Sequence, residues 1–208
     1  ENRERVWFPF ATHKGLAEQV EGWLSQVRAR SRFGVLCPTQ QGDACALLDE
    51  MRLIKDLHEQ DIMRRAAQIS AQAHVRAMQR SARMIRNGEE VREYHLDAEL
   101  LHEFRQHGSQ YVAYGSIVAA GANACVLHYQ ADKAPVRAGE LVLIDAGCEL
   151  DGYASDITRT FPADGKFSGA QRALYDLVLA SQEAAIAVTR AGNRFNDPHD
   201  ATVAVLAQ

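Results

Sequence analysis

The sequence predicts an α+β fold in which helices precede and follow a largely antiparallel sheet. Two observations carry this prediction. Apolar residues recur every three or four positions in the first half of the chain and again near its end, whereas short apolar runs bounded by turn residues lie between them. The clearest of these runs is 141–162, LVLIDAGCELDGYASDITRTFP, which indicates a strand, a tight turn and a returning strand.

Composition excludes several classes of function. The net charge of −4 leaves no basic surplus, so we expect no nucleic-acid partner. No apolar run has the length of a membrane span and no secretion signal is present, so we expect a cytoplasmic protein that does not bind membranes. The four cysteines lack CxxC spacing, which favours free thiols, with Cys125 and Cys148 predicted to be buried.

The first fifty residues predict a short element, a helix and a connector. Residues 1–11 contain three large aromatic side chains and predict an element packed on a neighbour. Apolar spacing predicts a helix along 16–27, with Trp23 as a core aromatic on its apolar face. The segment 34–50 contains proline, glycine and polar residues and is interpreted as a connector.

Two helices are predicted before the sheet. Asp56 and Glu59 have the spacing of a reciprocal cap that starts a long helix, and Asn87–Gly88 closes it. His74 on this helix is interpreted as a packing residue. A second helix is predicted over 92–107, where apolar residues recur at fourfold spacing.

Strands and two further helices complete the prediction. Residues 116–120 predict a strand, and 125–129 form another short apolar segment. His128 is polar within that segment, so it either faces a cavity or is a hydrogen-bonded core histidine, and the residues alone favour the core. Later helices are predicted over 168–189, capped by its first serine, and from 201 to 208.

The register of the predicted hairpin follows from its turn. With Asp151 and Gly152 as the central residues of a type I′ turn, successive side chains alternate between the two faces. Four residues then share one face: Asp145, Gly147, Asp156 and Thr158. The two carboxylates lie on a diagonal over a glycine, and at about 5 Å they repel each other by about 3 kcal/mol at an effective dielectric constant near 20.

Three arrangements can offset this repulsion: a shared proton, a neighbouring cationic side chain, or a metal ion. Arg159 is adjacent in sequence but points to the opposite face in this register. We therefore favour a cation held between Asp145 and Asp156. The structural alternative is that one aspartate caps a turn and the other is exposed.

Three motifs in the chain resemble those of a known protein family. VLHY at 126–129, LIDAGC at 143–148 and GYASDITRTFP at 152–162 resemble the aminopeptidase P group of the creatinase/methionine-aminopeptidase metallopeptidases, which have the pita-bread fold. The resemblance implies that 51–208 is the first half of a pita-bread catalytic domain. It also implies that 1–50 is the end of an N-terminal domain and its linker.

The resemblance further implies an aminopeptidase that removes the residue before proline from peptides with proline in second position. Two Mn²⁺ ions, or Co²⁺ or Zn²⁺, would be held by five ligands, of which Asp145 and Asp156 match the two aspartates. His128 matches a histidine that hydrogen-bonds the substrate or the tetrahedral intermediate. Tyr114 is a candidate for the wall of the substrate cavity.

One departure from the family pattern stands out. A histidine and two glutamates complete the ligand set in the family, but His199 and Glu183 are the only such residues after Asp156. We therefore expect a truncated chain that binds metal weakly and is inactive alone. Half of an internally pseudo-symmetric domain would also expose a sheet edge and apolar surface, so we expect self-association as a homo-oligomer. The alternatives are a prolidase-type dipeptidase and a non-catalytic pita-bread module that binds a peptide or protein.

Overall fold

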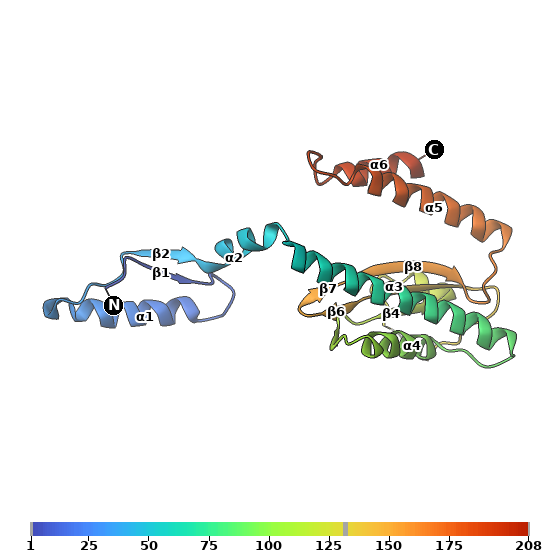
Figure 1. Ribbon diagram of the computed structural model, residues 1–208, viewed down its shortest axis with the longest axis horizontal. Coiled ribbons are helices and arrows are strands. Elements are labelled where there is room, and N and C mark those ends of the chain that lie inside the picture. Colours follow the sequence, from blue (N-terminus) through green and yellow to red (C-terminus); the bar gives the residue numbers. More distant parts are fainter. Residues whose placement is uncertain (1, 131–132, 208) are drawn as a thin grey trace. The chain divides into compact units, whose positions relative to one another are not determined.

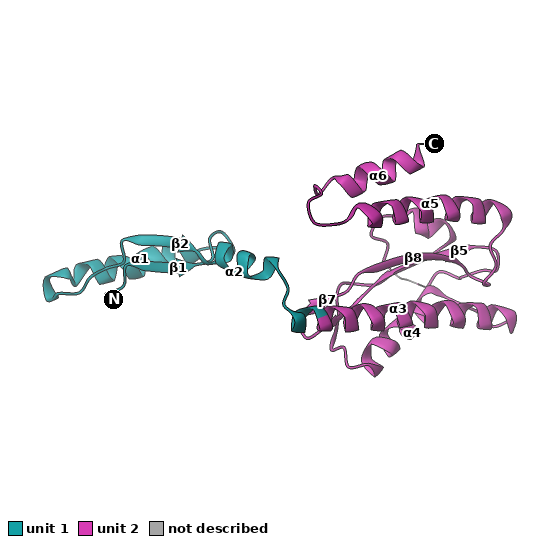
Figure 2. Cartoon of the chain, turned by 45° about the horizontal axis from the view of Figure 1, so that its top comes forward, with its two compact units in different colours: residues 1–60 teal, residues 61–208 magenta. Residues whose placement is uncertain are grey.

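The computed structural model describes residues 2–130 and 133–207 and divides the chain into two units, residues 1–60 and 61–208 (Figure 2). Each unit has its own cluster of buried apolar side chains. Helices and antiparallel sheets together make up the second unit, which confirms the predicted α+β class.

The first unit is built on a short parallel sheet. Its elements are β1 (Arg5–Phe8), α1 (Leu16–Ala29), η1 (Ser31–Phe33), β2 (Gln40–Asp43) and α2 (Ala44–Leu53). β1 pairs with β2 in parallel, so the aromatic start of the chain does form an element packed on a neighbour. The segment 34–50 is more than the predicted connector, because it contains β2 and the start of α2.

The prediction that Trp23 is a core aromatic is wrong. α1 buries Val20 and Leu24 beside Phe8, but the Trp23 side chain is 53% exposed. Val20 and Leu24 are four residues apart and lie on one line along the helix, whereas Trp23 lies on the flank of that line. A sheet of only two strands is too narrow to cover both.

The two helices that precede the antiparallel sheets begin and end where the sequence predicts. Asp56 and Glu59 form the reciprocal cap: Glu59 N donates to Asp56 Oδ1 at 2.8 Å, and Asp56 N donates to Glu59 Oε2 at 2.6 Å. The long helix α3 (Leu57–Arg86) follows, and α4 (Glu93–Gln106) comes after a turn. His74 is buried in α3, as predicted for a packing residue.

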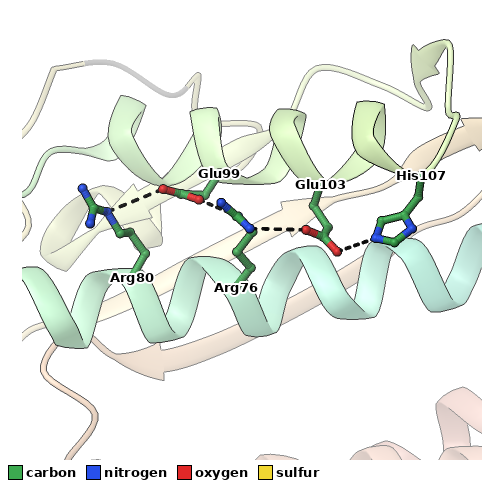
Figure 3. A network of polar contacts seen from close by, with 5 residues as sticks. All are labelled: Arg76, Arg80, Glu99, Glu103 and His107. Carbon is green, nitrogen blue, oxygen red and sulfur yellow. Dashed lines mark hydrogen bonds and ion pairs between the residues drawn. The ribbon is translucent and has the colours of Figure 1, made fainter.

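A chain of ion pairs joins α3 to α4 (Figure 3). Arg76 Nε lies 2.5 Å from Glu99 Oε2, and Arg80 Nε lies 3.5 Å from the other oxygen of the same carboxylate. Arg76 Nη1 also lies 3.7 Å from Glu103, whose other oxygen lies 2.9 Å from His107 Nε2. The two helices are therefore held together by charge on this face as well as by their apolar faces.

Two three-stranded antiparallel sheets lie beside these helices (Figure 1). One has the order β3–β6–β7 and the other β4–β5–β8. The strands and the intervening 3₁₀ helix are β3 (Tyr111–Val112), β4 (Ile117–Ala120), η2 (Gly121–Cys125), β5 (Leu141–Ala146), β6 (Cys148–Leu150), β7 (Tyr153–Ala154) and β8 (Ile157–Pro162). Alternate residues of β5, namely Val142, Ile144 and Ala146, are fully buried in the core that α3 and α4 share with the sheets.

Two helices end the described chain, α5 (Gly169–Val188) and α6 (Asp197–Leu206), and they lie side by side (Figure 1). Ser168 caps α5 as predicted, since its Oγ accepts from Gln171 N at 3.3 Å. α6 begins four residues before the predicted start, with Pro198 in its first turn. Gln208 lies outside the described residues. None of the helices in the described part of the chain has both the length and the apolar character that crossing a bilayer requires.

Candidate metal centre

The hairpin has the predicted register. Asp151 and Gly152 have φ of 49° and 84°, which are the positive values that the two central residues of a type I′ turn require. Leu150 pairs with Tyr153 at the tip, and Asp145 pairs with Thr158 nearer the base. Asp145 and Asp156 therefore belong to the same face of the hairpin.

Gly147 allows the two arms of the hairpin to approach closely. A Cβ at this position would lie 1.7 Å from the carbonyl oxygen of Ser155, so every other residue would collide with the opposite backbone. Ser155 N donates to Cys148 O at 2.9 Å, which keeps the pairing continuous while the hairpin passes from one sheet to the other. Asp156 follows directly after this crossing.

A bulge brings a third side chain to the same place. Val112 pairs with Cys148 and Ile117 pairs with Asp145, so the four residues 113–116 lie opposite only two, Ala146 and Gly147. Extra residues in one strand bend it and redirect its side chains. Tyr114 is one of these four residues.

The Tyr114 hydroxyl group lies between the two carboxylates. Its oxygen is 2.5 Å from Asp145 Oδ1 and 2.7 Å from Asp156 Oδ1. The two carboxylate oxygens are therefore within about 5 Å of each other, a distance at which their repulsion is about 3 kcal/mol at an effective dielectric constant near 20. Asp145 is half-buried and Asp156 is exposed.

The hydroxyl group does not remove the negative charge of the pair. Burial raises the pKa of Tyr114, and its hydrogen bonds to Asp145 and Asp156 raise it further, so the group remains a neutral donor. One hydroxyl hydrogen cannot fully satisfy two carboxylates. Within the described chain neither aspartate has an ion pair with a lysine or arginine, and Arg159 instead donates to the Thr158 carbonyl at 2.8 Å.

This donor set suits part of a divalent-metal site. Two carboxylates that converge without a cationic partner offer the oxygen ligands that hard divalent ions prefer. Residues 2–130 and 133–207 contain no group of three or more histidine, cysteine, aspartate or glutamate side chains that could hold an ion. Asp145 and Asp156 therefore fit a site whose remaining ligands are not supplied by the described residues.

His128 is not the core histidine that its apolar neighbours predicted. It is exposed, its φ is 56°, and its side chain has no hydrogen bond to any described residue, the two aspartates included. Val126 and Leu127 are 55% and 86% exposed, and the Cys125 thiol is exposed rather than buried. The reason is local: η2 ends at Cys125, and a turn rather than a buried strand follows it. Cys148 is buried as predicted.

A cavity of about 560 Å³ lies between the sheet and α5. Leu141, Thr158 and Thr160 line it from the sheet, and Leu174 and Val178 line it from α5. Thr158 is the residue directly opposite Asp145 in the pairing of β5 and β8, so the cavity is on the face of the sheet that carries Asp145.

Comparison with known proteins identifies the family. Residues 61–208 match metallopeptidase family M24. This chain belongs to metallopeptidase family M24. The match covers the hairpin, the bulge and both aspartates, so membership of the M24 family rests on the same part of the chain as the candidate centre.

Relatives within the M24 family confirm the resemblance to aminopeptidase P and the pita-bread fold. The chain is 46% identical over 173 residues to the Xaa-Pro aminopeptidase of Escherichia coli, a match that covers 83% of this chain and 38% of that protein. The solved structure of Pseudomonas aeruginosa aminopeptidase PepP has a TM-score of 0.91 and 45% identity, and it covers 99% of this chain. Zinc-substituted E. coli aminopeptidase P in complex with product has a TM-score of 0.87 and 39% identity over 98% of this chain. The chain covers 45% of each of these two solved chains, so it spans less than half the length of these M24 relatives.

Proposed function

We propose that this chain is the first half of the catalytic domain of a metal-dependent Xaa-Pro aminopeptidase. The observation that carries the proposal is the convergence of Asp145 and Asp156 on the Tyr114 hydroxyl group from two arms of one hairpin. The similarity to the Xaa-Pro aminopeptidase of E. coli supports the choice of reaction. The substrate would be a peptide with proline in second position, and residues 1–50 would belong to the preceding domain and linker.

In this proposal Asp145 and Asp156 are ligands of two divalent ions. Mn²⁺ is the ion that we propose, and Co²⁺ or Zn²⁺ would suit carboxylate and imidazole ligands as well. When bound, such ions supply a hydroxide from water and polarise the scissile carbonyl group.

The other residues act around the ions. Tyr114 orients both carboxylates through its hydroxyl group, as outer hydrogen bonds do at many metal sites. His128 would donate a hydrogen bond to the substrate carbonyl oxygen, where negative charge develops. The nitrogen of an Xaa-Pro bond carries no hydrogen, so the site would recognise it by shape.

The 208-residue chain would not catalyse the reaction alone, because two carboxylates leave most coordination positions of two ions to water. An assay with an Xaa-Pro tripeptide and the matching dipeptide tests this, and a preference for the dipeptide would favour the prolidase alternative. Appreciable hydrolysis by the purified chain would contradict the expectation of inactivity.

Titration with MnCl₂, followed by calorimetry or by the electron paramagnetic resonance of free Mn²⁺, tests the ligands directly. We expect Asp145→Asn to weaken binding by at least about tenfold, because it replaces a charged ligand by a neutral one. Asp151→Asn is the matched control, since it makes the same change at the exposed tip of the same hairpin, where asparagine before glycine suits a type I′ turn. Equal Mn²⁺ affinity in the two variants would refute the assignment.

A further inference from the structure

Glu93 is a fully buried carboxylate that the proposed function does not use. Its relative exposure is 0%, and it begins α4. Oε1 accepts from Ala120 N at 2.9 Å and from Asn123 Nδ2 at 3.0 Å, and Oε2 accepts from the Tyr129 hydroxyl group at 2.9 Å. A buried carboxylate is costly to form unless donors surround it, and here three donors do so.

These three donors come from one stretch of chain. Ala120 ends β4, Asn123 lies in η2, and Tyr129 follows His128. Asn123 Nδ2 also donates to the Tyr129 oxygen at 3.0 Å, so Glu93, Asn123 and Tyr129 form a closed triangle of hydrogen bonds. The triangle ties both ends of residues 121–129 to the same carboxylate.

The chain beyond this stretch is held to the same end of α4. Glu93 N donates to Ala134 O at 3.1 Å, and Val136 N donates to Val91 O at 2.9 Å. The Tyr129 side chain is therefore hydrogen-bonded to Glu93, and the backbone at Ala134 and Val136 is hydrogen-bonded to Glu93 and Val91. His128 lies within this anchored stretch although it has no side-chain partner among the described residues.

Anchoring of this kind is what an exposed catalytic side chain requires. His128 has a positive φ, a conformation that a residue other than glycine keeps only when its surroundings impose it. Neither Val126 nor Leu127 supplies burial that could hold the segment, because both are exposed. Hydrogen bonds to Glu93 hold Asn123 and Tyr129, which lie on the two sides of this segment.

We infer that Glu93 is a positioning residue that acts through Asn123 and Tyr129 to hold the His128 imidazole where a bound peptide can reach it. The inference rests on the proposed function for the role of His128, whereas the anchoring itself does not depend on catalysis. Its immediate consequence is that removing one hydroxyl group, that of Tyr129, loosens the His128 segment without unfolding α4.

Hydrogen exchange of the 208-residue chain tests the anchoring. The reporters are the amides of Val126 and Tyr129, which donate within this segment to Asn123 O and Val126 O at 3.0 and 3.3 Å. We expect Tyr129→Phe to speed the exchange of these two amides by about tenfold or more, because the variant loses a hydrogen bond to a charged group. Exchange of the α4 amides should be unchanged. Tyr111→Phe is the matched control, because that side chain is 64% exposed and has no hydrogen bond from its hydroxyl group to a described residue.

Glu93→Gln is a second variant that keeps the size of the side chain. It should also speed exchange of the two reporter amides, because it removes the charge that strengthens all three bonds. Unchanged exchange at Val126 and Tyr129 in the Tyr129→Phe variant would overturn the inference. This result is distinct from a failure of the proposed function, which would show as unchanged Mn²⁺ affinity in Asp145→Asn.

A catalytic measurement separates positioning from general stability. In a protein that joins this chain to a complete ligand set, Tyr129→Phe should lower kcat for an Xaa-Pro peptide by about tenfold with little change in KM. In a His128→Ala background the same substitution should have no further effect, because it acts through His128. Additive losses in the double variant would overturn the positioning role.

Discussion

Gly147 is the residue on which the approach of the two carboxylates depends. A methyl group at this position would lie 1.7 Å from the Ser155 carbonyl oxygen, and that atom belongs to backbone that cannot move without breaking the hairpin. Gly147→Ala should therefore lower the free energy of unfolding by more than about 3 kcal/mol, which urea denaturation measures. Gly169→Ala is the matched control: it has no atom within 4 Å of the new methyl group and begins a helix, so it should be neutral or slightly stabilising. Equal stability of the two variants would contradict this account.

At the residue scale, the sequence predicts the position of a side chain when residues close to it in the chain determine that position. The pairing of Asp145 and Asp156 on one face follows from a two-residue turn and the period of two in a strand, and both are read from adjacent residues. The place of Tyr114 is not predictable in this way, because it depends on a bulge between strands distant in sequence. Trp23 and His128 were predicted in the core from the apolar residues around them, but burial depends on which elements cover a face.

Among the elements, α3 and α4 are joined by a network that a single substitution can test (Figure 3). Arg76 contacts both Glu99 and Glu103, whose side chains are only 20% and 13% exposed. Removing it with Arg76→Ala leaves two partly buried carboxylates without this partner, so we expect a loss of about 1 kcal/mol in unfolding free energy that shrinks in high salt.

Arg83→Ala is the control for this prediction. Arg83 is an exposed arginine on the same helix and has no ion pair with a described residue. The substitution should change stability little at any salt concentration. A loss that is equal in both variants, or that does not depend on salt, would show that Arg76 acts through packing rather than charge.

At the scale of elements, α1, α3, α4 and α5 were predicted because their signals are local, whereas α2 was missed within the predicted connector. Asp56 and Glu59 form the predicted reciprocal cap, and Ser168 caps its helix as predicted, with Gln171 as a partner that was not predicted. β2 was missed because a strand of four residues that contains glycine and glutamine has no apolar alternation. Its existence depends on pairing with β1, which lies more than thirty residues earlier.

The whole second unit presents surfaces that favour association with a second copy. Within the described chain β8 ends its sheet, and an unpaired edge is a template for another strand. On α5, Leu174 and Val178 are 62% and 52% exposed. We therefore expect light scattering to show a mass above that of a monomer, which rises with protein concentration.

A charge at Val178, which is 52% exposed although it lines the cavity between α5 and the sheet, tests this prediction. Val178→Lys should shift the population towards monomer, because a lysine at this position opposes burial of the surface. Val75→Lys is the control, since Val75 is 51% exposed on α3. A monomer at every concentration in the wild-type protein would rule out self-association.

The crossing of the hairpin between the two sheets has a mechanical consequence. Asp145 belongs to β5, whereas Asp156 lies in the two-residue link that joins β7, in the sheet with β3, to β8, in the sheet with β5. Flexing one sheet against the other would change the gap between their carboxylates. An ion bound by both carboxylates would oppose that flexing. Because such coupling is reciprocal, a substitution that stabilises the conformation with the two carboxylates close together would raise the affinity for the ion.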